Sequence, residues 1–202
     1  MYRIFKDDCV IFLIDNLEFQ EKSNFYNWND FNLQNFLNDC NKNISSDIFL
    51  YHTDLEILWE EFKYSFKLIE AAGGIVFNSD KEILFIYRND KWDLPKGKVE
   101  LNEKLKETAI REVQEESGVK KIEIQDFIMS TYHIYTENER EILKVSHWFR
   151  MYSHDNKKSI LKPQIEEGIT KAVWKDINAI QKALQNTYPN IKMLIKNSLS
   201  RG

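Results

Sequence analysis

The hydrophobic pattern of the chain changes character near residue 66. Before it, YRIF and CVIFLI predict two strands joined by the turn KDD, and IFLY before Thr53 predicts a possible third strand. The segment from Phe31 has apolar residues at helical spacing, and Thr53-Asp54-Leu55-Glu56 predicts a capping box that opens a second helix, LEILWEEFKYSF. Residues 1–66 are therefore expected to form a small α/β domain, of ββαα or βαβα type, whose role the pattern does not indicate.

From residue 67 the pattern predicts a longer alternation of strands and helices. IEAAGGIVF and EILFIYR predict paired strands with a turn at residues 80–82, and KWDLPKGKVE predicts a loop. Asn102 is the expected N-cap of a helix that runs to Ser117, and Gly118 stands where a left-handed C-cap belongs. Strands are then expected around 127–135, around 143–152 and up to Trp174, followed by two helices separated near Tyr188-Pro189. The predicted fold class is α/β (α+β), with a second domain over residues 67–202.

Composition narrows the class of protein. A chain of 202 residues with 43% hydrophobic and 30% charged residues is expected to fold around a proper core. The net charge of −4 gives no general attraction to nucleic acid, so a polyanionic substrate would need local cations or a metal. Cys9 and Cys40 are far apart and belong to no zinc or disulfide pattern. The apolar run at residues 9–14 is too short for a signal peptide or membrane span, and a cytoplasmic location is expected.

The helix expected up to Ser117 carries an unusual density of acids. On a helix, Glu112, Glu115 and Glu116 fall within one sector of roughly 100°, beside the apolar stripe of Leu105, Ala109 and Val113. A solvated face would place its acids opposite that stripe. Carboxylates this close repel one another unless a cation neutralises them, and hard oxygen ligands suit Mg²⁺ or Mn²⁺. Glu103 and Arg111 are expected to brace the preceding loop against the helix, and Gly97 to bring a bare backbone carbonyl toward the cation.

These residues carry a resemblance to a known family. The spacing G-x5-E-x7-R-E-U-x-E-E-x-G-U, where U is aliphatic, defines the Nudix box, and the chain resembles it at every fixed position: Gly97, Glu103, Arg111, Glu112, Val113, Glu115, Glu116, Gly118 and Val119. The order of AAGGIVF, LPKGK and the strand ending at Trp174 extends the likeness to about residues 67–200.

The resemblance implies a fold and a chemistry. Nudix proteins have a mixed sheet between helices, and active members use Mg²⁺ or Mn²⁺ to hydrolyse a nucleoside diphosphate linked to another group. Carried over by position, Glu112, Glu115, Glu116 and the Gly97 carbonyl are implied metal ligands. The same three glutamates, with Arg111 and Glu103, are the implied catalytic set.

Residues outside the box supply further candidates. Some family members recruit one more acid ahead of the last strand, which here is Glu167 or its neighbour Glu166; Glu167 is the implied further metal ligand, and a plain solvated loop is an equal alternative. Arg88, Lys96 and Lys98 surround the entry to the box and are expected to bind phosphate. On the strand STYHIYT, His133 and Tyr135 are expected to contact the substrate, with packing of a half-buried sheet as the alternative.

Two functions of different classes remain. The favoured one is a Nudix pyrophosphohydrolase acting on a dinucleoside polyphosphate or a nucleoside triphosphate, since LPKGK resembles the entry loops of such enzymes. The alternative is a Nudix-derived sensor that binds a nucleotide and regulates a partner, although the box glutamates are intact. An isomerase or a decapping-like use of the fold has no distinguishing residue. The expected partners are a nucleotide-like small molecule and possibly a second copy of the chain, with no nucleic acid and no membrane.

Overall fold

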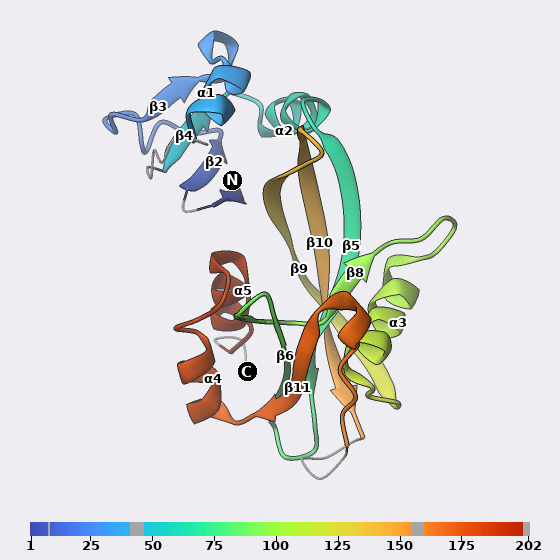
Figure 1. The fold of residues 1–202 in the computed structure, drawn as a ribbon. Helices are drawn as coiled ribbons and strands as arrows, with labels where there is room; N and C mark the ends of the chain where they lie inside the picture. The colour runs from blue at the N-terminus through green and yellow to red at the C-terminus, as the bar shows by residue number, and fades with distance from the viewer. Residues whose placement is uncertain (8, 41–46, 155–159, 200–202) are drawn as a thin grey trace. The chain divides into compact units, whose positions relative to one another are not determined.

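The computed structural model describes residues 1–7, 9–40, 47–154 and 160–199. By their contacts, these residues divide into two compact units, one of residues 1–69 with 132–144, the other of residues 70–131 with 145–202 (Figure 1). Strands β5 (Lys67–Phe77), β9 (Ile122–Glu137) and β10 (Arg140–Ser153) contribute to both. The first unit thus includes a hairpin from late in the chain, and whether residues 1–66 fold as a separate domain stays a prediction.

The first unit is a sheet with two helices on one face. Its strands are β1 (Tyr2–Lys6), β2 (Cys9–Ile14), β3 (Phe25–Asn27) and β4 (Ile48–Tyr51), in the order β1–β2–β4–β3. The strands predicted from YRIF, CVIFLI and IFLY are therefore confirmed. A 3₁₀ turn η1 (Trp28–Asp30) and the helices α1 (Leu33–Cys40) and α2 (Leu55–Tyr64) complete the unit. Alternate strand residues such as Ile4, Ile11 and Leu50 pack against Leu37 and Phe62 of these helices.

The β9–β10 hairpin joins this unit through backbone pairing and through an ion pair. Strand β1 pairs in parallel with β9 at Phe5 and His133. The buried Lys6 side chain donates to Glu141, with Nζ 3.2 Å from Oε2. An unpaired buried ammonium group is costly, so Glu141 has a structural role at this position.

The second helix of this unit begins at Leu55, as the segment LEILWEEFKYSF predicts, but its cap differs from the expected one. Its N-cap is Asp54, whose carboxylate accepts from the backbone N–H groups of Glu56 and Ile57. The prediction of Thr53 as the first residue of a capping box is wrong, because the adjacent carboxylate satisfies the free N–H groups itself.

The second unit holds a sheet in the strand order β11–β6–β5–β10–β9. Strand β6 (Ile83–Arg88) pairs antiparallel with β11 (Ile169–Lys175), and a short 3₁₀ turn η2 (Ile165–Glu167) precedes β11. The helices are α3 (Leu105–Ser117), α4 (Ile177–Ala183) and α5 (Pro189–Leu199). The expected class, a sheet between helices, is confirmed in this unit.

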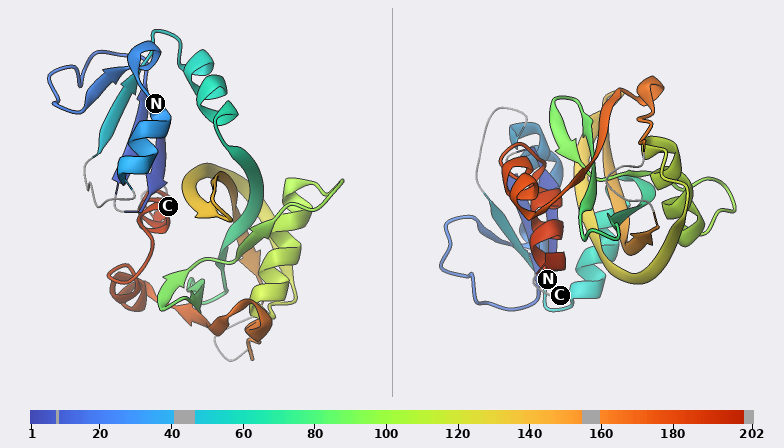
Figure 2. Two further views of the ribbon diagram at one scale, coloured as in Figure 1. Left: turned by 45° about the horizontal axis from the view of Figure 1, so that its top comes forward. Right: turned by 90° about the horizontal axis from the view of Figure 1, so that it is seen from below.

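Two hydrophobic clusters fill the opposite faces of this sheet. On β5, Val76 packs with Ala109 and Val113 of α3, whereas its neighbour Ile75 packs with the cluster of α4 and α5. Figures 1 and 2 show α3 on one side of the sheet and α5 on the other. The alternation of side chains along a strand explains why one apolar run serves both layers.

The entry to the acidic helix differs from the expectation in two ways. The expected loop KWDLPKGKVE contains two short strands, β7 (Lys91–Asp93) and β8 (Lys96–Lys98), which pair with β6 and β5. Asn102 is not the N-cap: it has a φ of 65°, and α3 begins after Lys104, whose backbone N–H donates to Glu107. Asparagine tolerates this left-handed conformation, which here makes a turn instead of a cap. At the other end, Gly118 is the predicted left-handed C-cap, with a φ of 77°.

Candidate active site

The candidate site begins where β8 meets α3. Strand β8 pairs with β5, opposite Ala72 at Gly97, which holds the Gly97 backbone directly beside the Glu112 carboxylate. A Cβ atom at Gly97 would lie 2.0 Å from the Glu112 Cδ atom. A side chain at this position would therefore displace the Glu112 carboxylate, which gives the glycine at the first position of the box a steric reason.

Arg111 connects the helix to the preceding loop. Its Nε donates to Glu103 Oε1 at 2.8 Å, and its Nη2 donates to Glu103 Oε2 at 2.9 Å and to the Lys98 carbonyl at 3.1 Å. Thr108 Oγ1 and the backbone N–H of Glu100 also donate to Glu103. This bidentate pair is a strong, oriented contact between residues eight positions apart.

The same contacts set the protonation of Glu103. The hydrogen bonds from Arg111 lower the pKa of Glu103 to about 2, against a smaller opposing effect of burial. The pKa of Arg111 is raised in turn, chiefly by its hydrogen bond to Glu103. The pair therefore stays charged over the whole physiological range.

Glu116 is a fully buried carboxylate that is only half satisfied. Its Oε2 accepts from the backbone N–H of Lys96 at 2.9 Å, whereas its Oε1 has no hydrogen-bond partner among the described residues. The nearest cation to Oε1 is Arg88, whose Nη1 lies 3.7 Å away. Burial raises the pKa of Glu116 to about 7, although the Lys96 charge opposes the shift.

The other two box glutamates share the remaining nitrogen of Arg111. Its Nη1 donates to Glu112 Oε1 at 2.6 Å and to Glu115 Oε2 at 3.0 Å. Burial raises the pKa of Glu112 despite this contact. Glu112 is buried and Glu115 is about half exposed. The exposure of the three carboxylates therefore rises from Glu116 through Glu112 to Glu115.

Asp93 is a buried acid that the sequence analysis did not single out. It lies on β7 and accepts from the Lys96 side chain and from the Leu94 backbone N–H. Burial would lower the pKa of Lys96, but Asp93 and Glu116 outweigh it and the pKa is raised. Lys96 is thus held as a cation between two buried carboxylates. The spacing of three residues between Asp93 and Lys96 was the signal in the sequence that could have identified this ion pair.

The loop acid Glu167 lies at the same edge. Its Oε2 is 3.5 Å from Arg88 Nη1, and its charge contributes to the raised pKa of Glu112. Arg88 therefore links Glu116 and Glu167, and both Glu167 and its neighbour Glu166 are exposed. Lys98 contributes its backbone carbonyl to Arg111, and its side chain is exposed.

His133 and Tyr135 belong to the other compact unit. Their rings stack, with centroids 5.9 Å apart, on the part of β9 that groups with the N-terminal strands. Their expected role in substrate binding stays a prediction.

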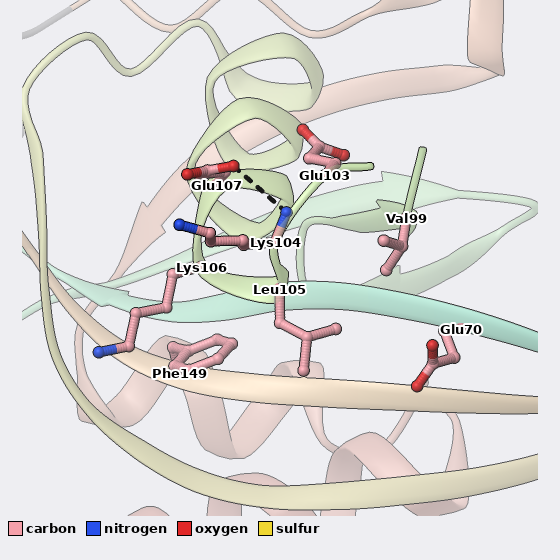
Figure 3. A pocket seen from close by; sticks show the side chains of 8 residues that line it. All are labelled: Glu70, Val99, Glu103, Lys104, Leu105, Lys106, Glu107 and Phe149. Carbon is pink, nitrogen blue, oxygen red and sulfur yellow. Dashed lines mark hydrogen bonds between the residues drawn. The ribbon is translucent and has the colours of Figure 1, made fainter. Parts of the chain in front are cut away.

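A pocket of about 590 Å³ lies at the start of α3, away from the carboxylates at its end. Figure 3 shows Leu105 and Phe149 facing it, with Val99 and Glu70 farther along. Glu103 also lines it and forms an ion pair with Arg111. The pocket lining therefore includes Glu103 of the box, whereas Glu112, Glu115 and Glu116 are not among its lining residues.

The fit of a divalent cation can be judged from the donors. The unpartnered Glu116 Oε1, the Glu112 carboxylate against Gly97 and the nearby Glu115 supply only hard oxygen atoms. Among the described residues, however, no three acids are close enough to form a ready metal cluster, because Arg111 lies between Glu112 and Glu115. The donor set fits a divalent cation, and binding one requires these carboxylates to exchange an arginine contact for a metal contact.

Every helix in the part of the chain that the structure describes is too short or too polar to span a bilayer.

Comparisons with known proteins show the family of this chain. The NUDIX domain model matches residues 67–195. The m7GpppN-mRNA hydrolase of Saccharomyces cerevisiae is 31% identical over 149 residues, which cover 72% of this chain and 14% of that protein. The chain thus spans about a seventh of that relative's length.

Solved structures support the fold. The MutT protein of Methanosarcina mazei has a TM-score of 0.51 at 20% identity over 67% of this chain and 96% of that one. A C. elegans Ap4A hydrolase has a TM-score of 0.51 at 17% identity over 65% and 96%. With the family model covering most of the chain and every fixed position of the box in place, the chain belongs to the NUDIX domain family.

Proposed function

We propose that the chain is a Nudix pyrophosphohydrolase that hydrolyses a phosphoanhydride bond with Mg²⁺ or Mn²⁺. The observation that carries the proposal is Glu116, a fully buried carboxylate whose Oε1 accepts no hydrogen bond from the described residues and has only Arg88, 3.7 Å away, within ion-pair distance among them. Such a group is costly unless a cation pairs with it. The family in general uses divalent metals, and the intact box speaks against a sensor that has lost its ligands.

The proposal gives each residue a role. Glu112, Glu115, Glu116 and the Gly97 carbonyl hold the cation. A bound divalent cation lowers the pKa of water and neutralises charge on the phosphate oxygens. Glu103 and Arg111 are positioning residues that hold the loop against α3 while Arg111 Nη1 moves off the glutamates.

The edge formed by Arg88, Lys96 and Lys98 receives the phosphates. Glu167, held by Arg88, is the further acid that orients or deprotonates the attacking water.

The favoured substrates are dinucleoside polyphosphates and nucleoside triphosphates. The match to a yeast m7GpppN-mRNA hydrolase over 72% of this chain favours a second candidate, the capped end of an RNA. A cap is itself two nucleosides joined 5′ to 5′ by a polyphosphate, so both substrates present the same kind of bond to the site. The nucleoside triphosphate differs in having a free terminal phosphate.

The test is hydrolysis of a panel by the full chain. It contains Ap4A, ATP, 8-oxo-dGTP and an m7G-capped RNA, each with Mg²⁺, Mn²⁺ or EDTA, with products separated by chromatography. Changing Glu116→Gln is expected to lower kcat/KM at least about 100-fold, because even indirect partners of a metal ligand cost roughly 10- to 100-fold. The matched control Glu166→Gln, an exposed acid, is expected to match the wild type. Equal turnover by the Glu116→Gln chain, or full turnover in EDTA, would refute the proposal.

A further inference from the structure

Asp93 and Lys96 form a largely buried ion pair beside the box carboxylates. Asp93 is 5% exposed, its Oδ2 accepts from Lys96 Nζ, and the Lys96 side chain is 14% exposed. Asp93 lies outside the Nudix box, and the proposed hydrolysis gives it no role. A buried ion pair contributes little net stability by itself. The effect of this pair on the neighbouring carboxylates is therefore the more informative feature.

The sheet and the loop before α5 hold Asp93 in place. Its strand, β7, pairs with β6. At the preceding residue, the Trp92 backbone N–H donates to the Asn186 carbonyl at 2.9 Å, and Thr187 Oγ1 donates to the Trp92 carbonyl at 2.6 Å. The Asp93 carboxylate is therefore a fixed anchor for the Lys96 ammonium group.

Lys96 also lies beside Glu116. Its backbone N–H donates to Glu116 Oε2 at 2.9 Å, whereas Glu116 Oε1 accepts no hydrogen bond from the described residues. Burial would lower the pKa of Lys96, but the charges of Asp93 and Glu116 raise it. Two buried carboxylates thus attract the ammonium group, and among the described residues its ion pair is with Asp93.

The other cation near Glu116 has more freedom. Arg88 Nη1 lies 3.7 Å from Glu116 Oε1 and 3.5 Å from Glu167 Oε2, and the Arg88 side chain is 36% exposed. When a divalent cation binds Glu116, the guanidinium group can turn to Glu167 or to the solvent. The buried Lys96 ammonium group has no such alternative without Asp93, because an unpaired buried charge is costly. It would then pair with Glu116.

We propose that Asp93 is a positioning residue that holds the Lys96 ammonium group off Glu116 and so leaves Glu116 Oε1 open to a divalent cation. This inference rests on the proposed cation binding at Glu116. Without the Asp93 carboxylate, Lys96 competes with the cation, although all three box glutamates remain. An ammonium group has three N–H donors, so pairing with Asp93 still leaves two for a substrate phosphate.

A double-mutant cycle on the full chain tests the proposal, with Mn²⁺ affinity measured by electron paramagnetic resonance. Asp93→Asn removes the charge but keeps an oxygen for the Leu94 N–H, which Asp93 Oδ1 accepts at 2.8 Å. It is expected to weaken Mn²⁺ binding about tenfold, because partners that orient a metal ligand contribute this much. Adding Lys96→Gln is expected to restore the affinity to within about threefold of the wild type, because the competing cation is gone.

The same Lys96→Gln change in the wild type is expected to alter Mn²⁺ affinity by less than about threefold, because Asp93 already holds the ammonium group. An effect of Lys96→Gln that is equal in both backgrounds would show a simple sum of charges and overturn the proposal. Unchanged affinity in the Asp93→Asn chain would overturn it too, as would a loss that Lys96→Gln does not restore. Circular dichroism melting checks folding, and Asp93→Ser replaces an Asp93→Asn chain that does not fold.

The matched control is Asp80→Asn, which removes the same charge from an exposed position in the unit and is expected to bind Mn²⁺ like the wild type. The cycle and the hydrolysis panel fail separately. A wild type that binds Mn²⁺ but hydrolyses nothing in the panel would refute the proposed function and leave the cycle intact. An active wild type with an additive cycle would refute only the role of Asp93, and a wild type that binds no Mn²⁺ would overturn both.

Discussion

At the residue scale, Arg111 makes two separate sets of hydrogen bonds. Its Nε and Nη2 hold Glu103 and the Lys98 carbonyl, and its Nη1 holds Glu112 and Glu115. The first set can persist while the second is exchanged for a cation. The guanidinium geometry allows this division, because its donors point in fixed, separate directions.

Glu103 makes stability depend on pH in the acid range. Its pKa of about 2 in the folded chain lies below its value of roughly 4.3 in an unfolded one. The stabilisation is therefore fully present above pH 4.3 and is lost as the pH falls toward 2. The Tm difference between wild type and Glu103→Gln is expected to shrink over that range, as measured by circular dichroism melting.

The control for this pH effect is Glu100→Gln in the same turn, which is exposed and is expected to follow the wild type. A Tm difference that stayed constant from pH 5 to pH 2.5 would contradict the role given to the Glu103–Arg111 pair.

At the element scale, the contact between β8 and α3 builds the site. Each element is short or ordinary by itself: β8 has three residues, and α3 has a common amphipathic pattern. Their packing places the Lys96 N–H on Glu116 and the Gly97 backbone on Glu112. The fixed spacing of the box residues therefore reflects the packing of one face of α3 against β8.

Gly97→Ala tests this packing. The added methyl group would occupy the place of the Glu112 carboxylate, although the Gly97 carbonyl remains. Mn²⁺ affinity, measured by electron paramagnetic resonance, is expected to fall at least about tenfold, since displaced ligand geometry costs this much. Melting of the metal-free protein separates this effect from a general loss of folding. Unchanged Mn²⁺ affinity would show that cation binding does not require the Glu112 carboxylate to lie beside Gly97.

At the scale of the whole molecule, the β9–β10 hairpin belongs by contacts to the N-terminal strands. Ile134 and Leu143 are fully buried in the cluster that includes Ile4 and Leu58. We propose that residues 1–66 form a domain with its own role, and its core is complete only with this hairpin.

Deleting residues 1–66 is therefore expected to expose Ile134 and Leu143 and to cause aggregation, measured by light scattering. A chain that also replaces residues 132–145 with an Asn-Gly turn is expected to remain monodisperse and keep its Mn²⁺ affinity. A soluble, monodisperse chain after the simple deletion would contradict the shared core.

The sequence by itself determined the elements with strong local signals. The alternation in YRIF and CVIFLI, the left-handed Gly118 and the fixed spacing of the box each depend on neighbours within a few residues. The family followed from the same spacing. Weaker local signals failed at Thr53 and Asn102, where an adjacent carboxylate or a left-handed turn took precedence.

Only the tertiary structure decided what depends on residues far apart in the chain. The strands β7 and β8 have three residues each, too few for a period to appear, and they exist because β6 and β5 pair with them. The full burial of Glu116, whose Oε1 accepts no hydrogen bond from the described residues, also depends on packing between residues far apart in the chain. Burial and cross-strand register are set by packing, and a linear pattern carries neither.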